Sequence, residues 1–340
     1  MDSSRIHRTA FKFGSFNSSS YGEMLLAPDG RIKVYNHPNE HRFRFDGDVL
    51  EFLSVSGVVT SRVKWHGEIG AFLPLDRTRH FLWPLLSLEP PVPVARTARI
   101  IVNTVPKAGT YLLEEVLTQL GFRSIHLHLN HNGLYDDRGV PSEELHFDPG
   151  DRFVPCPPRA VAELLAPGEF AVGHIDSKPE LDAIRAAGVH VIGSIRDLRE
   201  VAVSFYRFKR DKVKATRPAD HVIKSLDPRA GFLAYLVQSA EDELPSFMRL
   251  TRLLREDPCC LLRFEEITSG QLSQRSRDGL DAIEPGLAAA FVEALTAALG
   301  RPTSTFSGQL SLADEFDWPE ARQIYEAVGY LEANREAGYL

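Results

Sequence analysis

A strand, a short turn and a helix follow one another between residues 99 and 121, and this unit constrains the fold more than any other stretch. The apolar run at residues 100–102 is typical of a buried strand. Gly121 then takes the position of a left-handed helix C-cap. Between this strand and Gly121, the apolar residues fall at helical spacing: Leu112, Leu113, Val116, Leu117 and Leu120. Such a unit points backbone N–H groups and the positive end of a helix dipole at one spot. Because the turn also carries Lys107, the unit predicts a binding site for a phosphate or sulfate group.

The turn sequence P-K-A-G-T, residues 106–110, differs from a Walker A loop. A Walker A loop places its lysine directly after its second glycine and a Ser or Thr directly after the lysine. Here Lys107 precedes Gly109, and Ala108 follows the lysine. A kinase of the P-loop type would need that hydroxyl to hold Mg²⁺. A P-loop-type kinase therefore stays an alternative and is not the favoured interpretation.

Composition sets outer limits on function. The 340 residues are 43% hydrophobic and 25% charged, as in a soluble globular protein with a large core. A net charge of -7 argues against general nucleic-acid binding, which requires a basic face. The three cysteines, two of them adjacent, imply no disulfide framework. Neither a signal peptide nor the roughly 20 apolar residues of a membrane span is found in the sequence, so we expect a cytoplasmic protein.

The N-terminal region differs from the rest of the chain. Residues 20–80 contain short alternating apolar runs separated by turn sequences, which predict an antiparallel β region. Residues 83–95 contain four prolines and predict a linker. We therefore expect a β-rich region with its linker at residues 1–95 and an α/β domain at residues 96–340. The β region is expected to be structural, with Tyr35, His37 and Trp65 as the alternative, acceptor-contacting residues.

The second part of the chain alternates strand and helix signals, which predicts a central parallel sheet flanked by helices. The expected strands are residues 170–175, 189–195 and 259–264, and the expected helices are residues 179–187, 198–210, 228–255 with a break near Pro245, 286–299, 319–328 and 331–337. Residues 122–168 are rich in His, Asn, Asp and Pro and predict a long irregular segment. Its histidines at 126, 128 and 131 match no metal-ligand pattern, so no metal is expected.

A second segment with binding potential begins at Arg196, at the end of an expected strand. Ser204 lies eight residues later on the helix that follows. A guanidinium and a hydroxyl in this arrangement could bind one phosphate together. Taken alone, the pair is more simply explained as a capping arginine and a buried helix serine.

Taken together, the segments resemble sulfotransferases that use 3′-phosphoadenosine 5′-phosphosulfate (PAPS). The turn at residues 106–110 is similar to their 5′-phosphosulfate loop, and the run from Arg196 to Ser204 is similar to their 3′-phosphate segment. Residues 262–267 are similar to their strand-end R-Y-E-D-L segment. The resemblance covers roughly residues 98–330 and implies a P-loop NTPase-like sulfotransferase fold, with the small antiparallel β region outside it. It also implies PAPS as donor and adenosine 3′,5′-bisphosphate as product.

The resemblance implies roles for individual residues. Lys107 would stabilise the leaving group, and His174, in a short segment similar to the family's T-H-L-P motif, would be the general base. The reserve bases are Asp136, Asp137 and Asp176. The implied donor-binding residues are Pro106, Lys107, Ala108, Gly109, Thr110, Tyr111, Arg196, Ser204, Ser307 and Gly308.

The sequence departs from the family at three places. The family's basic F-R-K-G loop corresponds to residues 305–308, T-F-S-G, which lack the basic pair. Val172 replaces a frequent lysine, and Tyr111 stands where many members have Thr or Ser. The expected partner is a small-molecule or glycan acceptor with a hydroxyl group. A non-catalytic nucleotide- or glycan-binding protein is the other alternative, and the acceptor and the oligomeric state stay open.

Overall fold

The computed structural model describes residues 3–16, 20–141, 144–145, 149–215, 217–257, 260–299 and 316–340. Two of the expected site residues, Ser307 and Gly308, lie outside the described residues, as does Cys259. The chain divides into two units. The first comprises Met1–Pro93, Asn132–Leu134 and Val154–Ala166, and the second Val94–His131, Tyr135–Phe153 and Pro167–Leu340. The two short inserted segments of the first unit have no counterpart in the expected boundary at residue 95.

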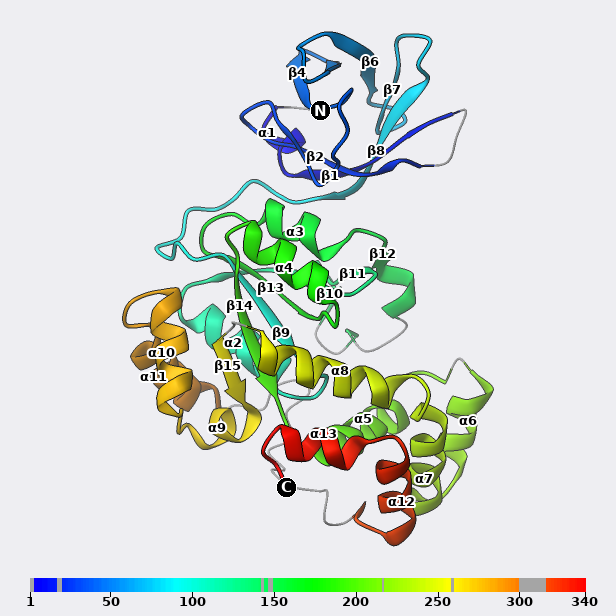
Figure 1. The fold of residues 1–340 in the computed structure, drawn as a ribbon, viewed down its shortest axis with the longest axis vertical. Coiled ribbons are helices and arrows are strands. Elements are labelled where there is room, and N and C mark those ends of the chain that lie inside the picture. Colours follow the sequence, from blue (N-terminus) through cyan, green and yellow to red (C-terminus); the bar gives the residue numbers. More distant parts are fainter. Residues whose placement is uncertain are drawn as a thin grey trace. The chain divides into compact units, whose positions relative to one another are not determined.

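The first unit is built on an eight-stranded antiparallel sheet in the order β3-β2-β1-β8-β7-β6-β5-β4 (Figure 1). Its elements are α1 Ser3–Ile6, β1 Thr9–Ser15, β2 Gly22–Leu26, β3 Ile32–Lys33, β4 Arg42–Asp46, β5 Val49–Leu53, β6 Val59–His66, β7 Ala71–Pro74, β8 His80–Ser87 and α3 Pro158–Leu164. An isolated bridge between Arg31 and Arg42 connects the two end regions of the sheet, which therefore approaches a barrel. The aromatic residues Phe11, Phe13, Phe52 and Phe72 are fully buried in its core.

The linker expected at residues 83–95 begins later than predicted, because β8 runs to Ser87. Pro84 pairs with Phe11 next to a shift of register in β1, which is a place where a sheet tolerates a residue without an N–H group. The three side chains considered for acceptor contacts are engaged within the unit. Trp65 packs 5.1 Å from the ring of Phe72, Tyr35 packs 5.2 Å from that of Phe13, and His37 pairs with Glu40 at 2.8 Å.

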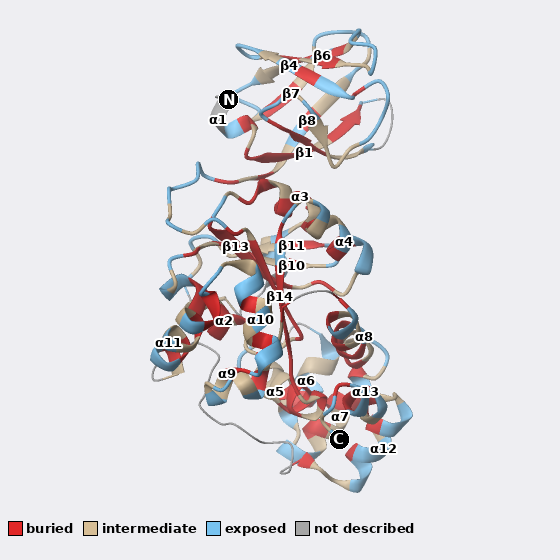
Figure 2. Cartoon of the chain, turned by 60° about the vertical axis from the view of Figure 1, so that its left-hand side comes forward, coloured by how far each residue is buried: buried red, intermediate tan, exposed pale blue. Residues whose placement is uncertain are grey.

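The second unit is a mixed α/β arrangement around a seven-stranded sheet in the order β12-β11-β10-β13-β9-β14-β15. The strands are β9 Ile100–Thr104, β10 Arg123–Asn130, β11 Gly133–Asp136, β12 Phe153–Val154, β13 Glu169–His174, β14 His190–Ile195 and β15 Cys260–Arg263. The pairs β10–β13, β13–β9, β9–β14 and β14–β15 are parallel. Figure 2 shows that β13 and β14 are largely buried, as expected for central parallel strands.

Helices supply the apolar partners of this sheet. They are α2 Thr110–Gln119, η1 Pro149–Arg152, α4 Lys178–Ala186, α5 Leu198–Asp211, α6 Pro218–Ser225, α7 Pro228–Ser239, α8 Glu243–Glu256, α9 Phe264–Ser269, α10 Gln274–Ile283, α11 Leu287–Leu299, α12 Pro319–Ala327 and α13 Tyr330–Glu336. Helices α2, α10 and α11 share one core cluster with β9 and β13, whereas α5 to α8, α12 and α13 share another. The expected break near Pro245 falls earlier, at residues 240–242, because proline is tolerated in the first turn of α8.

The expectation of an irregular segment at residues 122–168 is wrong. It contains the eight-residue strand β10, two short strands and α3. In β10 the buried residues Ile125, Leu127 and Leu129 alternate with polar ones, which is a strand pattern, but the high His, Asn, Asp and Pro content of the whole segment had indicated irregular structure. His126 has φ 52°, and the register of β10 against β13 shifts between Ser124 and His128.

Among the residues that the structure describes, no single helix has the length and apolar composition of a membrane span; α10 and α11 reach them only when the bent pair is counted together.

Candidate functional site

Three neighbouring strands end at the same edge of the second unit's sheet. Strand β9 lies between β13 and β14, and all three run parallel, with Gly173 and Gly193 both in register with Asn103. Parallel strands place their carboxyl ends together, where ligands commonly bind in α/β sheets. Lys107, His174 and Arg196 lie at or directly after these three ends. The fold thus brings together the residues that three separate sequence segments had singled out.

The turn between β9 and α2 is held from several sides. The Val105 N–H donates to the Ser194 carbonyl at 2.9 Å, and the Ser194 hydroxyl donates to the Ala108 carbonyl at 2.6 Å. Lys107 and Gly109 both have left-handed backbones, with φ 67° and φ 94°. A Cβ atom on Gly109 would lie 3.2 Å from the ring of Phe264, which is closer than ordinary contact. The turn therefore has little freedom to rearrange.

Helix α2 begins without a side-chain cap. Gly109 is its N-cap, and its first turn contains no acidic residue. The Leu113 N–H makes the first bond within the helix, to the Gly109 carbonyl at 2.9 Å, so the four preceding N–H groups have no partner of that kind. The hydroxyl of Thr110 pairs with that of Thr104 at 2.5 Å. An anion at this helix end would be stabilised by the N–H groups and by the helix dipole.

The amine of Lys107 lies against helix α5. Its Nζ atom is 3.4 Å from the ring centroid of Phe208 and 6.0 Å from that of Phe205. Burial lowers the pKa of Lys107 to about 7. The aromatic faces stabilise the charged form only in part. Because a neighbouring anion favours the charged form, a ligand at the α2 end would raise this pKa.

His174 is the last residue of β13, and its ring is fixed in one tautomer. Its Nδ1 atom lies 2.7 Å from the Thr104 carbonyl, which can only accept, so Nδ1 carries the proton and the lone pair is on Nε2. Burial, helped by the positive charge of Lys107, lowers the pKa of His174 to about 4. The imidazole is therefore neutral at physiological pH. Its ring lies 4.7 Å from that of His128, edge to face.

Asn103 fixes the strand end that carries His174. Its side chain donates to the Ile175 carbonyl at 3.0 Å and accepts from the Ile175 N–H at 2.6 Å. The amide thereby extends the contact between β9 and β13 past their last backbone pair, which joins Gly173 to Asn103. This side chain holds the histidine from the adjacent strand.

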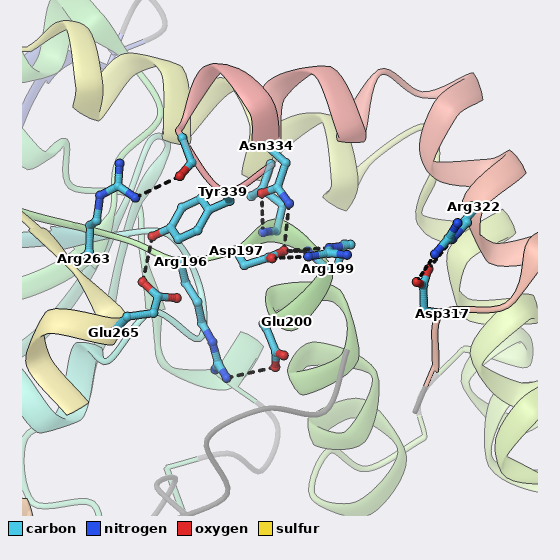
Figure 3. A network of polar contacts seen from close by, with 12 residues as sticks. Arg196, Asp197, Arg199, Glu200, Arg263, Glu265, Asp317, Arg322, Asn334 and Tyr339 are labelled. Carbon is cyan, nitrogen blue, oxygen red and sulfur yellow. Dashed lines mark hydrogen bonds and ion pairs between the residues drawn. The ribbon is translucent and has the colours of Figure 1, made fainter. Parts of the chain in front are cut away.

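Arg196 follows β14 directly and is 6% exposed. Its guanidinium donates to the Lys107 carbonyl at 3.1 Å, pairs with Glu200 at 3.3 Å and stacks on Phe264 with 4.1 Å to the ring centroid. Burial lowers the pKa of Arg196, and the charge of Glu200 opposes that shift. Figure 3 shows the guanidinium directed at Glu200 on α5. Ser204 lies one turn beyond Glu200 on the same helix and is half-buried.

The three carboxylates considered as reserve bases each have a cationic partner. Asp136 binds the guanidinium of Arg138. Asp137 pairs with Arg152 at 3.0 Å, and burial raises its pKa to about 6. The third carboxylate, Asp176, accepts hydrogen bonds from Ser246 at 3.0 Å and Arg249 at 2.8 Å. These pairs tie up the carboxylates, whereas Nε2 of His174 keeps its lone pair.

Tyr111 lies on the first turn of α2, where its ring is 6.3 Å from that of His128. Burial and the charge of Asp137 raise the pKa of its hydroxyl. Within the described parts of the chain, no group of three or more His, Cys, Asp or Glu side chains could hold a metal ion. His126 and His131 instead approach Glu114 at 3.6 Å and Asp176 at 3.3 Å.

Sequence reasoning missed several residues of this site. Asn103 and Thr104, which hold the His174 strand end, stand as two polar residues at the end of an apolar strand, and that contrast is a usable signal. Phe264 contacts both Arg196 and the Gly109 turn, and it belongs to a segment already singled out without a role. Nothing near Asn334 in the sequence indicates its contacts with residues 197 and 198.

No protein-family model matches the chain, and no curated protein matches its sequence. Among solved structures, the fold is similar to that in the crystal structure of mouse sulfotransferase SULT7A1 complexed with PAP. The TM-score is 0.43 with 12% sequence identity, and the match covers 72% of this chain and 89% of that chain.

Proposed function

We propose that this chain transfers a sulfuryl group from PAPS to a hydroxyl of an acceptor, a carbohydrate or a natural-product alcohol. The observation that carries the proposal is the hydrogen bond from Arg196 to the Lys107 carbonyl, at 3.1 Å. It joins the two turns that the sequence had singled out for two different anionic groups. His174, at the third strand end, completes the set with a neutral base.

The residues present fit a donor with two separate anionic groups. The uncapped N-terminus of α2 and the Lys107 amine suit a phosphosulfate, and Arg196 with Ser204 suits a 3′-phosphate. When bound, PAPS supplies a sulfuryl group joined to a good leaving group. Pro106, Ala108 and Thr110 contribute through the shape of the turn. The kinase alternative fits less well, because Ala108 stands where a Mg²⁺-binding hydroxyl would be needed.

In this proposal His174 accepts the proton of the acceptor hydroxyl at Nε2. The Thr104 carbonyl holds the proton on Nδ1, so Nε2 carries no proton before the acceptor binds. General base catalysis by a positioned histidine contributes about 10²–10⁴ in rate. The imidazolium that forms is disfavoured by burial and by Lys107. Proton transfer is therefore best matched to an acceptor that loses its proton late, as bond formation proceeds.

Lys107 stabilises the charge that develops on the leaving oxygen. A cation held at that position is worth about 10²–10³ in rate, by analogy with oxyanion-hole donors. The amine has a pKa of about 7 in the described state. It must be charged to act, and the negative charge of a bound donor would keep it so.

Nucleotide binding tests the proposal first. Adenosine 3′,5′-bisphosphate at 100 times its dissociation constant should stabilise the chain by about 2.7 kcal/mol, measured by thermal shift. ATP with Mg²⁺ and adenosine 5′-monophosphate should give smaller shifts. A larger shift with ATP and Mg²⁺ favours the kinase alternative, and no shift with the bisphosphate overturns the proposal.

Turnover separates an enzyme from a non-catalytic binding protein. The chain is incubated with ³⁵S-labelled PAPS and a panel of carbohydrate and phenolic or aliphatic alcohol acceptors. Transfer of the label to an acceptor is the expected result. Binding of the bisphosphate without label transfer to any acceptor, and without release of sulfate from PAPS, would leave only a binding role.

A further inference from the structure

We propose that Asn334, on the C-terminal helix α13, is a positioning residue for Arg196. Asn334 is fully buried and lies 137 residues along the chain from Asp197, whose side chain it contacts. The inference rests on the proposed function, because it concerns how well Arg196 is held for the 3′-phosphate of the donor.

Both polar ends of the Asn334 side chain are used on the turn that follows Arg196. Its Nδ2 atom donates to the Asp197 carboxylate at 2.8 Å, and its Oδ1 atom accepts from the Leu198 N–H at 2.8 Å. The amide cannot be turned round, because a backbone N–H only donates and a carboxylate only accepts. One buried side chain thus fixes two consecutive residues (Figure 3).

Helix α5 needs this outside partner at its N-terminus. Asp197 is the N-cap and accepts from the Arg199 N–H at 2.9 Å, which leaves the Leu198 N–H without a partner inside the helix. The side-chain oxygen of Asn334 accepts a hydrogen bond from this N–H group. The Arg199 guanidinium also binds the Asp197 carboxylate, at 2.7 Å, so that carboxylate is held in place from its own helix and from α13.

The same C-terminal segment contacts the residue before Arg196. The hydroxyl of Tyr339 lies 3.3 Å from the Ile195 carbonyl and 3.0 Å from the Glu265 carboxylate. Its ring lies under the guanidinium of Arg263, 4.9 Å from the ring centroid, and Arg263 donates to the Ala337 carbonyl at 2.9 Å. Backbone on both sides of Arg196 is therefore held by residues 334–339. Figure 3 shows Asn334 at the Asp197 turn and the hydroxyl of Tyr339 bonded to Glu265.

The guanidinium of Arg196 has partners of its own, so loosening the turn would misplace the side chain without releasing it. Glu200, the Lys107 carbonyl and Phe264 would still attract it. A shift of about 1 Å in a positioned group can cost about 10²-fold in the function it serves. The expected defect is thus largest for the group that Arg196 binds.

The experiment compares the affinities of adenosine 3′,5′-bisphosphate and adenosine 5′-monophosphate by titration calorimetry, at a temperature where every variant is folded. Asn334→Leu removes both hydrogen bonds at similar volume. We expect its affinity for the bisphosphate to fall by about tenfold and that for the monophosphate to change less than about twofold. Tyr339→Phe removes only a hydroxyl near the chain end and should give a smaller loss of the same selectivity.

Leu331→Ala is the matched control, since it trims apolar packing on α13 and removes none of the hydrogen bonds that Asn334 and Tyr339 make to residues 195–198. It should lower the melting temperature and leave the ratio of the two affinities unchanged. Equal losses for both nucleotides in Asn334→Leu, or an unchanged ratio, would overturn the positioning role. If Asn334→Leu does not fold, an unchanged ratio of the two nucleotide affinities in Tyr339→Phe would overturn the positioning role of this C-terminal segment. A wild-type chain that binds both nucleotides alike overturns the proposed function itself.

Discussion

Two strand-to-helix turns lie side by side in the second unit, and their helix N-termini are completed in opposite ways. The turn from β9 to α2 ends in Gly109, with no side-chain cap and no acidic residue in the first turn of the helix. The turn from β14 to α5 ends in Asp197, and its first N–H groups are taken by Asp197 and Asn334. In the proposed function, the first helix end binds an anionic group of the donor, whereas the second holds the turn that carries Arg196.

The basic side chains of the two turns, Lys107 and Arg196, differ in how permanent their charge is. Burial brings the pKa of Lys107 to about 7, so its charge can respond to a ligand. Arg196 stays charged in proteins and is held by Glu200 and by the ring of Phe264. In the proposed function, the responsive charge of Lys107 faces the group that is transferred, and the permanent charge of Arg196 faces a phosphate that stays unchanged.

The largest expected effect concerns His174, which lies at the third strand end and outside both turns. His174→Gln keeps a hydrogen-bonding side chain of similar reach but cannot serve as the base, so kcat should fall by about 10²–10⁴. Binding of adenosine 3′,5′-bisphosphate should stay within about twofold, because neither donor-binding turn is altered. An active glutamine variant would show that His174 is structural and would move the base to Asp137, the reserve carboxylate with a raised pKa.

The second prediction concerns the responsive turn. Lys107→Ala should lower kcat by about 10²–10³ while the protein still folds, because the lysine contributes charge to the site and little to the apolar core. Single-turnover rates with PAPS measure the effect. Lys107→Arg keeps a cation and serves as the control. Near-normal rates in the alanine variant would contradict the assignment of this turn to the transferred group.

The third prediction concerns the fixed turn. Arg196→Ala should raise the donor KM by about 10–10²-fold and reduce discrimination between PAPS and adenosine 5′-phosphosulfate, which lacks the 3′-phosphate. Arg196→Lys should recover only part of this, since an ammonium lacks the planar fork. If both variants keep full discrimination, the 3′-phosphate is bound elsewhere.

The pH dependence tests both charges at once. Only the neutral form of His174 is a base, so kcat/KM should be lost as the pH falls through about 4. This lies well below the pH at which activity that depends on an ordinary histidine is lost. Only the charged form of Lys107 stabilises the leaving group, so kcat/KM should decline as the pH rises through about 7. Bisphosphate binding near pH 8 should take up a proton, seen as a heat that depends on the buffer. Proton release would contradict this.

The smallest expected effect probes the tightness of the first turn. Gly109→Ala forces a left-handed alanine at φ 94° and brings its Cβ to 3.2 Å from Phe264, so the free energy of unfolding should fall by at least about 1–2 kcal/mol. Gly121→Ala, at φ 85° with nothing within 4 Å, is the matched control for the backbone term alone. Denaturant unfolding compares the two. Equal losses would mean that the contact with Phe264 is unimportant.

Apolar spacing and turn residues within a short stretch predicted those parts of the site that are formed by residues close together in the sequence. The strand, turn and helix around Lys107 were predictable because apolar spacing and two glycines fix them within a short stretch. Strand β10 was missed although Ile125, Leu127 and Leu129 alternate with polar residues, because the high His, Asn, Asp and Pro content of residues 122–168 is typical of an irregular segment. The contacts of Asn334 could not be predicted, since they depend on how α13 packs. The roles of Lys107, His174 and Arg196 stay predictions until the variants are measured.

The discontinuous make-up of the first unit has a consequence for how the chain folds as it is synthesised. Helix α3 belongs to that unit, where Arg8 binds the Leu164 carbonyl and Lys33 pairs with Glu163 at 2.5 Å. The β unit therefore cannot complete its contacts until residue 166 has left the ribosome, by which time β9, α2 and β10 have also been made. Deleting residues 1–93 would leave α3 without the strands β1 and β2 that it contacts. The two units are thus interleaved along the chain, and we expect that neither can be obtained intact by a single cut.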